Sequence, residues 1–359
     1  MRKSLLASLV LGAIAAPAFA DGTVTLYGIV NVPFEVAKTA NGTQSGVGGL
    51  GNPAQSPTGI NTPTRIGFKG DENLGDGMKA WWQIETGINL DDTTYTSGNG
   101  FANREGWVGL QGDFGKFGLG RGKTPYTNVA DIFDSSVDGG RDLAIYKQAN
   151  LGTVTSNRFD NAIRYDFPTA GGFTGAVMYG SGENKTADVS ATKNFSANVR
   201  YANGPFTVAA AFNSQKNLVG GDVKVPIPAG APVYGTKNDA FLLAGTVAID
   251  AWKLGLGYQH AKVDTNTTKR KADAWVGTVA YTIDALTLKA GLIDNLKIKS
   301  NGTDLDDTNY IRWNLGAKYA LSKRTAVYTE YTADDYKKGV DGKDKTDLNV
   351  FSIGLIHSF

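Results

Sequence analysis

The chain has no cysteine and only two histidines, His260 and His357, among its 359 residues. Without cysteine, neither a disulfide-stabilised secreted scaffold nor a thiolate metal site can form. The two histidines are almost a hundred residues apart, which argues against a zinc site. We therefore expect no metal and no cofactor.

Long apolar runs are also scarce. The one long uncharged run, residues 5–20, follows Arg2 and Lys3 and ends in Ala18-Phe19-Ala20. A basic start, an apolar stretch and a small-x-small end are typical of a secretory signal peptide that is removed on export. We expect residues 1–20 to be this signal and 21–359 to form one mature domain without a membrane-spanning helix.

Net charge is absent from the mature chain. Removing Arg2 and Lys3 from the 36 basic residues leaves 34, which equals the 34 acidic residues. A neutral chain lacks the basic footprint that nucleic acid requires, so no nucleic-acid partner is expected. Export without a later helical anchor points to the periplasm, the outer membrane or the exterior.

What the chain does have is alternation of apolar and polar residues with a period of two, the pattern of β-strands. Phe206, Val208, Ala210 and Phe212 share one face of such a segment. Only Asn128–Phe133 hints at a helical period in the mature chain. The pattern predicts sixteen strands, at residues 23–36, 64–70, 78–89, 103–111, 116–122, 159–167, 172–180, 195–203, 206–213, 240–249, 252–260, 273–282, 286–294, 309–319, 325–332 and 347–359.

The connections between these segments alternate strictly between short turns and long loops. With 339 mature residues and sixteen strands, each strand and its connection use about 21 residues, and a tilted membrane-crossing strand takes about 9–11 of them. A sheet of this size hides its edges by closing. The sequence therefore predicts a 16-stranded antiparallel transmembrane β-barrel.

A soluble β-sandwich, propeller or lectin is the alternative, since it also alternates apolar and polar residues. Three features argue against it: the regular alternation of loop length, the terminal Phe359, and aromatic residues near strand ends where a membrane interface needs them. The tryptophans assigned to these positions are Trp81, Trp82, Trp107, Trp252, Trp275 and Trp313.

Several motifs, taken together and in order, resemble the general porins of Gram-negative bacteria, in particular the β-proteobacterial, neisserial and Burkholderia-like type. They are Asp21–Gly28, Arg65–Gly70, Glu72–Gly75, Asn103–Arg104 with Val108–Leu110, Phe117–Arg121, Arg164–Asp166 and His357–Phe359. The resemblance implies a sixteen-stranded barrel, a homotrimer in the outer membrane, and a third loop folded into the lumen. It also implies passive diffusion of ions and small hydrophilic solutes.

Strand parity selects basic residues for the lumen. Placing Ile66 and Phe68 on the lipid turns Arg65 inward, and placing Ile163 on the lipid turns Arg158 and Arg164 inward. Arg104 turns inward if Trp107 faces out, which leaves Glu105 facing out as well. The resemblance implies that Arg65 and Arg104 belong to an arginine cluster at the narrowest point, with Arg158 or Arg164 as its third member. Where some relatives carry a lysine in the first strand this chain has Ile29, which predicts at most a weak preference for anions.

The connection at 124–157 is long enough to fold inward and form the opposite, acidic side of a constriction. Its acidic residues are Asp131, Asp134, Asp138 and Asp142, with Arg141 and Lys147 opposing them in sign. A transverse field between these acids and the arginines is expected. The last strand predicts a C-terminal barrel-assembly signal on one face, formed by Phe351, Ile353, Leu355, His357 and Phe359.

Other functions remain as alternatives. A substrate-selective channel, or an adhesin acting through loops 37–63 and 214–239, is compatible with the same barrel. Paired loop acids such as Asp306-Asp307 fit solvated loops better than a calcium site. Neither histidine has the serine and orienting group that a hydrolase needs, so no catalysis is expected. The expected partners are copies of the same chain, outer-membrane lipid and lipopolysaccharide, small solutes and ions, and the barrel assembly machinery.

Overall fold

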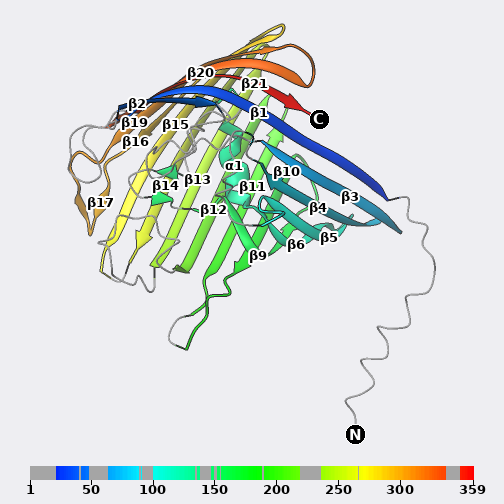
Figure 1. Cartoon of the computed structure of the whole chain (residues 1–359). Helices are drawn as coiled ribbons and strands as arrows, with labels where there is room; N and C mark the ends of the chain where they lie inside the picture. Colours follow the sequence, from blue (N-terminus) through cyan, green and yellow to red (C-terminus); the bar gives the residue numbers. More distant parts are fainter. Residues whose placement is uncertain are drawn as a thin grey trace.

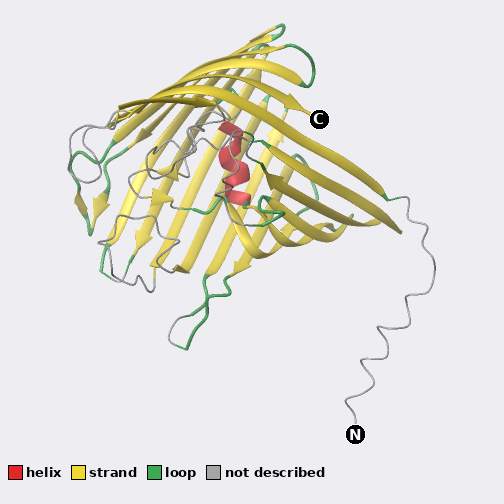
Figure 2. Cartoon of the chain, in the orientation of Figure 1, coloured by secondary structure: helices red, strands yellow, loops and turns green. Residues whose placement is uncertain are grey.

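The chain forms a closed antiparallel β-barrel with a short helix inside it (Figures 1 and 2). The computed structural model describes residues 22–39, 42–47, 64–88, 90, 100–133, 136–137, 147–148, 152–153, 155–187, 190–218, 236–265, 267–336 and 348–359. The predicted signal peptide lies outside the described residues. Within the described part, no helix is long and apolar enough to cross a membrane.

Sixteen strands form the wall and correspond one to one with the predicted segments. They are β1 (Thr23–Thr39), β3 (Arg65–Gly75), β4 (Met78–Gly87), β5 (Glu105–Gly112), β6 (Gly115–Lys123), β9 (Arg158–Asp166), β10 (Phe173–Ser181), β11 (Lys193–Asn203), β12 (Phe206–Leu218), β13 (Thr236–Ile249), β14 (Trp252–Asp264), β15 (Lys269–Ile283), β16 (Leu286–Asn295), β19 (Tyr310–Ala320), β20 (Thr325–Tyr336) and β21 (Leu348–Ser358).

The remaining elements belong to the long connections. They are the short strands β2 (Gly42–Val47), β7 (Lys147–Gln148), β8 (Gly152–Thr153), β17 (Lys299–Ser300) and β18 (Thr303–Asp304), the helix α1 (Pro125–Ala130) and the 3-10 helix η1 (Asp131–Phe133). The two helices lie where the sequence hinted at a helical period. The sequence did not predict the five short strands.

The first strand closes the barrel. Its first half pairs with β3, from Thr23 opposite Asp71 to Ile29 opposite Arg65. Its second half pairs with the last strand, β21, from Ile29 opposite Ser358 to Lys38 opposite Asn349. Within the described residues, every wall strand pairs with two others, so the sheet closes on itself as a lipid environment requires.

The C-terminal residue seals the junction between β1 and β21. The Gly28 amide donates to the carbonyl of Phe359 at 3.0 Å, and the Phe359 amide donates back to the Gly28 carbonyl at 3.1 Å. A Cβ at position 28 would lie 2.4 Å from the Phe359 ring, so glycine makes room for the terminal aromatic side chain. Phe351, Ile353, Leu355 and Phe359 are exposed on the outer face, as the alternation along the last strand predicts, while His357 is half-buried beside Thr325.

Alternation along each strand separates an apolar outer face from an inner face of small and polar residues. On β12, Phe206, Val208 and Phe212 are exposed, whereas Ala209 and Ala211, which lie between Val208 and Phe212, are buried. An apolar outer face is what a lipid environment requires. Trp252, Trp275 and Trp313 lie on this outer face as predicted.

Two tryptophans assigned to the outer aromatic belt face inward instead. The Trp81 ring lies under the ammonium group of Lys116, and its Nε1 donates to the carbonyl of Phe117 at 3.1 Å. Trp107 is 7% exposed and packs against Phe159. Both rings carry an N–H that needs a hydrogen-bond partner, and the polar interior supplies one where lipid does not.

Candidate pore constriction

The helix α1 begins with a strong local signal. The Thr124 side chain caps it by accepting a hydrogen bond from the Thr127 amide at 3.1 Å, and Pro125 occupies the first helical position. A threonine cap followed by proline favours a helix start, because the cap satisfies a free amide and proline has none to satisfy. The connection that the sequence predicted to fold inward therefore enters the lumen as a defined helix (Figure 2).

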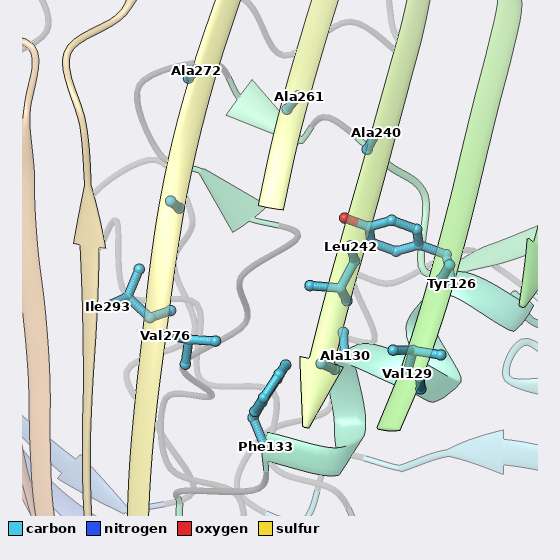
Figure 3. Close-up of a cluster of buried hydrophobic side chains, with 14 of the residues drawn as sticks. Tyr126, Val129, Ala130, Phe133, Ala240, Leu242, Ala261, Ala272, Val276 and Ile293 are labelled. Carbon is cyan, nitrogen blue, oxygen red and sulfur yellow. The ribbon is translucent and has the colours of Figure 1, made fainter. Parts of the chain in front are cut away.

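This helix packs on the inner wall formed by β11 to β15 (Figure 3). Tyr126 is fully buried, and its hydroxyl donates to Oε1 of Gln259 on β14 at 2.5 Å. The backbone amide of Tyr126 donates to the Ser196 hydroxyl at 3.0 Å, and the side-chain amide of Asn198 donates to the Pro125 carbonyl at 2.7 Å. The surrounding wall is apolar and small, with Ala209, Ala211, Ala240, Leu242, Ala244, Ala261 and Ala274 all buried. Small residues let the helix approach the strand backbones closely.

Phe133, at the end of η1, fits against two glycines of β14. A Cβ on Gly257 would lie 2.3 Å from the Phe133 ring, and a Cβ on Gly255 would lie 3.3 Å from it. Glycine at 257 is therefore a packing requirement. The sequence offered no sign of this contact, because it joins residues more than 120 positions apart.

Beyond η1 the connection reaches the wall at β16, β19 and β20. The Glu330 carboxylate accepts hydrogen bonds from the Val137 amide at 2.8 Å and from the Ser136 hydroxyl at 3.3 Å. The Lys289 ammonium donates to the Ser136 carbonyl at 2.8 Å. Contacts on β11 to β15 and then on β16 to β20 fix the described parts of this loop to one side of the lumen.

On the wall formed by β3 to β5, one carboxylate holds two arginines. Nε of Arg104 lies 2.6 Å from Oε1 of Glu85, and Nε of Arg65 lies 3.4 Å from Oε2. The Tyr27 hydroxyl donates to the same Oε2 at 3.1 Å. The Glu85 side chain is 9% exposed, so its charge needs these partners.

Glu105 lies directly across from Glu85 on the neighbouring strand. Nε1 of Trp107 donates to its Oε2 at 2.8 Å, the Lys123 amide donates to Oε1 at 3.2 Å, and Nε of Arg158 lies 3.6 Å from Oε1. Like charges directly opposite each other destabilise a strand pair. The arginines on both carboxylates offset that repulsion.

The prediction that Trp107 and Glu105 face outward is wrong. The exposed apolar residues of β5 are Val108 and Leu110, so Trp107 shares the inner face with Glu105. Arg104 still reaches the interior, because it precedes the first residue of β5 and its direction is set by the bond to Glu85. Its inward direction therefore comes from the ion pair with Glu85 and not from strand alternation.

Arg164 is also inside but in a separate ion pair. Its Nε and Nη2 donate to Asp166 at 2.9 and 2.6 Å, and Nη1 donates to the Lys123 carbonyl at 2.8 Å. Nearby, the Lys116 ammonium lies 3.7 Å from the centre of the Trp81 ring. Of the four predicted arginines, Arg65 and Arg104 thus pair with Glu85, and Arg158 lies beside Glu105. Arg164 pairs with Asp166.

A cavity of about 550 Å³ lies between α1 and this charged wall. Its lining contains five basic and three acidic side chains, a formal excess of two positive charges. The lining residues are Arg65, Trp81, Gln83, Glu85, Arg104, Glu105, Trp107, Lys116, Lys123, Asn128, Arg164 and Asp166.

The predicted acidic side is described at one position. Oδ2 of Asp131 accepts a hydrogen bond from the Lys123 ammonium at 2.5 Å, so this carboxylate pairs with the wall at the root of the loop. Asp134, Asp138, Asp142 and Arg141 lie outside the described residues, as does the Lys147 side chain. The carboxylates that sequence reasoning missed are Glu85 and Glu105. For Glu85 the signal was present, since Lys79, Gln83 and Glu85 share the polar face of β4.

Comparison with known proteins shows which family and which solved structures the chain resembles. A family model described as Gram-negative porin matches residues 7–339. The chain is 31% identical to the major outer membrane protein P.IB of Neisseria meningitidis serogroup B, over the full length of both. It resembles the solved structure of an anion-selective porin from Comamonas acidovorans, with a TM-score of 0.75 at 23% identity over 94% of this chain and 100% of that one. It also resembles a trimer form of OmpT, an outer membrane protein of Vibrio cholerae, with a TM-score of 0.66 at 21% identity over 94% and 99% of the two chains.

Proposed function

The chain belongs to the Gram-negative porin family and forms an outer-membrane channel, and we propose that the cavity beside α1 is the constriction that sieves and selects its solutes. A barrel of sixteen strands is too wide for side chains to fill, so it encloses water. The inward loop narrows this lumen, and passage past it is passive, without a catalytic step. Small hydrophilic solutes and ions are the permeants.

The charge of the lining favours anions. Arg65, Arg104, Lys116, Lys123 and Arg164 contribute five positive charges, against three negative ones on Glu85, Glu105 and Asp166. Charged rings at a narrow point set ion preference, and an excess of two positive charges supports a weak preference for anions. The similarity to an anion-selective porin points the same way.

The test is conductance of the purified, folded protein in a planar bilayer under a salt gradient. We expect a reversal potential of the sign that indicates anion preference, and a shift toward cations in Arg65→Ser and Arg104→Ser. Arg324→Ser is the matched control, because Arg324 is an exposed residue of the turn before β20. Unchanged conductance and ion preference in both pore variants would show that the two arginines only join neighbouring strands.

Three further expectations follow from membership of the family. We propose that the channel is a homotrimer, as the trimer form of the Vibrio relative supports, and that stepwise openings in multiples of three would reveal it. The exposed face of β21, ending at Phe359, would be the element that the barrel assembly machinery binds. Residues 1–20 would be cleaved on export.

A further inference from the structure

The indole ring of Trp81 lies against the inner wall on a pair of glycines. A Cβ on Gly118 would lie 2.8 Å from Cζ2 of Trp81, and a Cβ on Gly109 would lie 2.8 Å from its Nε1. These glycines are directly opposite each other on β6 and β5, so together they leave the space that the ring fills. The wall covers one face of the indole, and the ring forms part of the lining of the cavity.

The ammonium group of Lys116 lies over this ring, 3.7 Å from its centre. Of the five basic residues that line the cavity, Lys116 is the one that forms no ion pair within the described part of the chain. The carboxylate directly opposite Lys116 belongs to Asp166, and Arg164 binds it at 2.6 and 2.9 Å. The indole therefore takes the place of a counter-ion for Lys116.

This contact can be exchanged for another. A cation held over an aromatic face is bound less strongly than one that donates a charge-assisted hydrogen bond to a carboxylate. The ammonium group of lysine is carried on a flexible four-carbon stem, so it can move from the ring to a carboxylate that enters the cavity. That movement uncovers the indole face that Lys116 occupies.

An aromatic carboxylate can use both groups at once. Its carboxylate binds the Lys116 ammonium, and its ring packs against the uncovered face of Trp81 in the offset or edge-to-face geometry that aromatic pairs favour. A saturated ring with the same carboxylate offers the same charge without the aromatic attraction. The cavity of about 550 Å³ is within the size range of small-molecule sites.

From these observations we propose that Trp81 and Lys116 form a binding site for aromatic carboxylates, which retains these solutes as they pass the constriction. The inference rests on the proposed function of the cavity and adds a solute class to it. Ion preference depends on the total charge of the lining, whereas this selectivity depends on one indole ring. The two can therefore be tested separately.

The experiment measures the chloride current of the folded full-length protein in a planar bilayer while benzoate or cyclohexanecarboxylate is added. The two acids are monoanions of similar size at neutral pH and differ in aromaticity. We expect half-maximal block by benzoate at a concentration about 3–10-fold lower, the range that one aromatic pair contributes. Trp81→Leu should bring this ratio close to one, and Trp81→Phe should retain part of it.

The lysine is tested with a matched control. Lys116→Gln should weaken block by both acids, because both lose the same charge partner, and Lys116→Arg should restore it. Lys69→Gln removes the same charge from the same wall, where the Lys69 ammonium lies 5.3 Å from the centre of the Tyr27 ring but outside the cavity lining. We expect Lys69→Gln to leave the block by both acids unchanged.

Equal block by the two acids in the original chain, a benzoate preference that survives in Trp81→Leu, or equal losses in Lys116→Gln and Lys69→Gln would each overturn the proposal. Should Trp81→Leu form no channels, the ratio in Trp81→Phe and the Lys116 variants decide. A channel without anion preference that still distinguishes the two acids would contradict the charge argument for the constriction and leave this site standing.

Discussion

The carboxylate of Glu330 on β20 accepts a hydrogen bond from the amide of Val137 in the inward loop at 2.8 Å, across 193 positions of sequence. Glu330 is 2% exposed and Val137 is fully buried, so water does not replace this bond when it is lost. The loop is thereby tied to the wall at a point far from α1.

We expect Glu330→Ala to loosen the loop. Leaving the Val137 amide without an acceptor should lower the free energy of unfolding by about 1–3 kcal/mol, and single-channel recordings should show added current fluctuations. Glu330→Gln retains one carbonyl acceptor and should show a smaller effect. A steady current in Glu330→Ala would mean that other contacts suffice to hold the loop.

Gly257→Ala tests the fit of Phe133 against β14. The new methyl group would overlap the ring, since a Cβ there lies 2.3 Å from it. We expect a destabilisation of about 1–3 kcal/mol in urea titration, the usual effect of overpacking. Phe133→Leu in the same chain should restore part of the loss. Gly277→Ala on the adjacent strand meets nothing within 4 Å and should be close to neutral.

Removing the negative charge of Glu85 should raise the preference for anions. Glu85→Gln changes the formal excess of the cavity lining from two to three positive charges while keeping a similar shape. The reversal potential under a salt gradient should move further toward the anion limit. Asp71→Asn removes one negative charge from an exposed pair with Lys79 and serves as the control, with little or no shift expected. Equal shifts in the two variants would contradict a selective role for the cavity.

Tyr126→Phe should cost about 1–3 kcal/mol of unfolding free energy, because the buried Gln259 carbonyl loses its donor. Tyr126→Ala should cost about 3–5 kcal/mol, since it also removes the ring. Comparing the two variants in urea titrations separates the hydrogen bond from the packing.

The same tyrosine predicts a pH dependence. Burial raises the pKa of Tyr126 well above its ordinary value of 10.0, so the folded protein keeps the phenol protonated where the unfolded chain ionises. Its contribution to stability should therefore be constant below about pH 10 and should decline above it. Tyr126→Phe should lack this component of the alkaline decline, and an identical pH profile in both proteins would exclude it.

Much of the barrel could be predicted from the sequence, because lipid imposes alternation on each strand independently of its neighbours. All sixteen strands and the inner position of Arg65 were obtained in this way. Irregular backbone is not visible in the pattern. Strict alternation from exposed Ile163 places Phe159 on the lipid face, but Phe159 is buried. The reason is an irregularity in β9: Asn161 has φ of +46°, and the register between β6 and β9 shifts between Gly120 and Gly122.

The site was less predictable, because partners decide which way an amphipathic side chain turns. Trp107 suits a membrane interface as well as a polar interior, and only the carboxylate of Glu105 and the ring of Phe159 settle its direction. Similarly, Asp131 looked like the start of an acidic wall facing the arginines. It instead pairs with Lys123, eight positions earlier in the chain.

The seam between β1 and β21 has a consequence for how the protein is made. Residues 28 and 359 must meet before the ring of backbone hydrogen bonds is complete, so a chain shortened by its final strand would leave two open edges in hydrocarbon. The remaining fifteen strands could close only by pairing β1 with β20, and these two strands run parallel because each is antiparallel to β21. Truncation from the C-terminus should therefore yield no functional intermediate, whereas insertions at the tips of long loops leave the seam untouched.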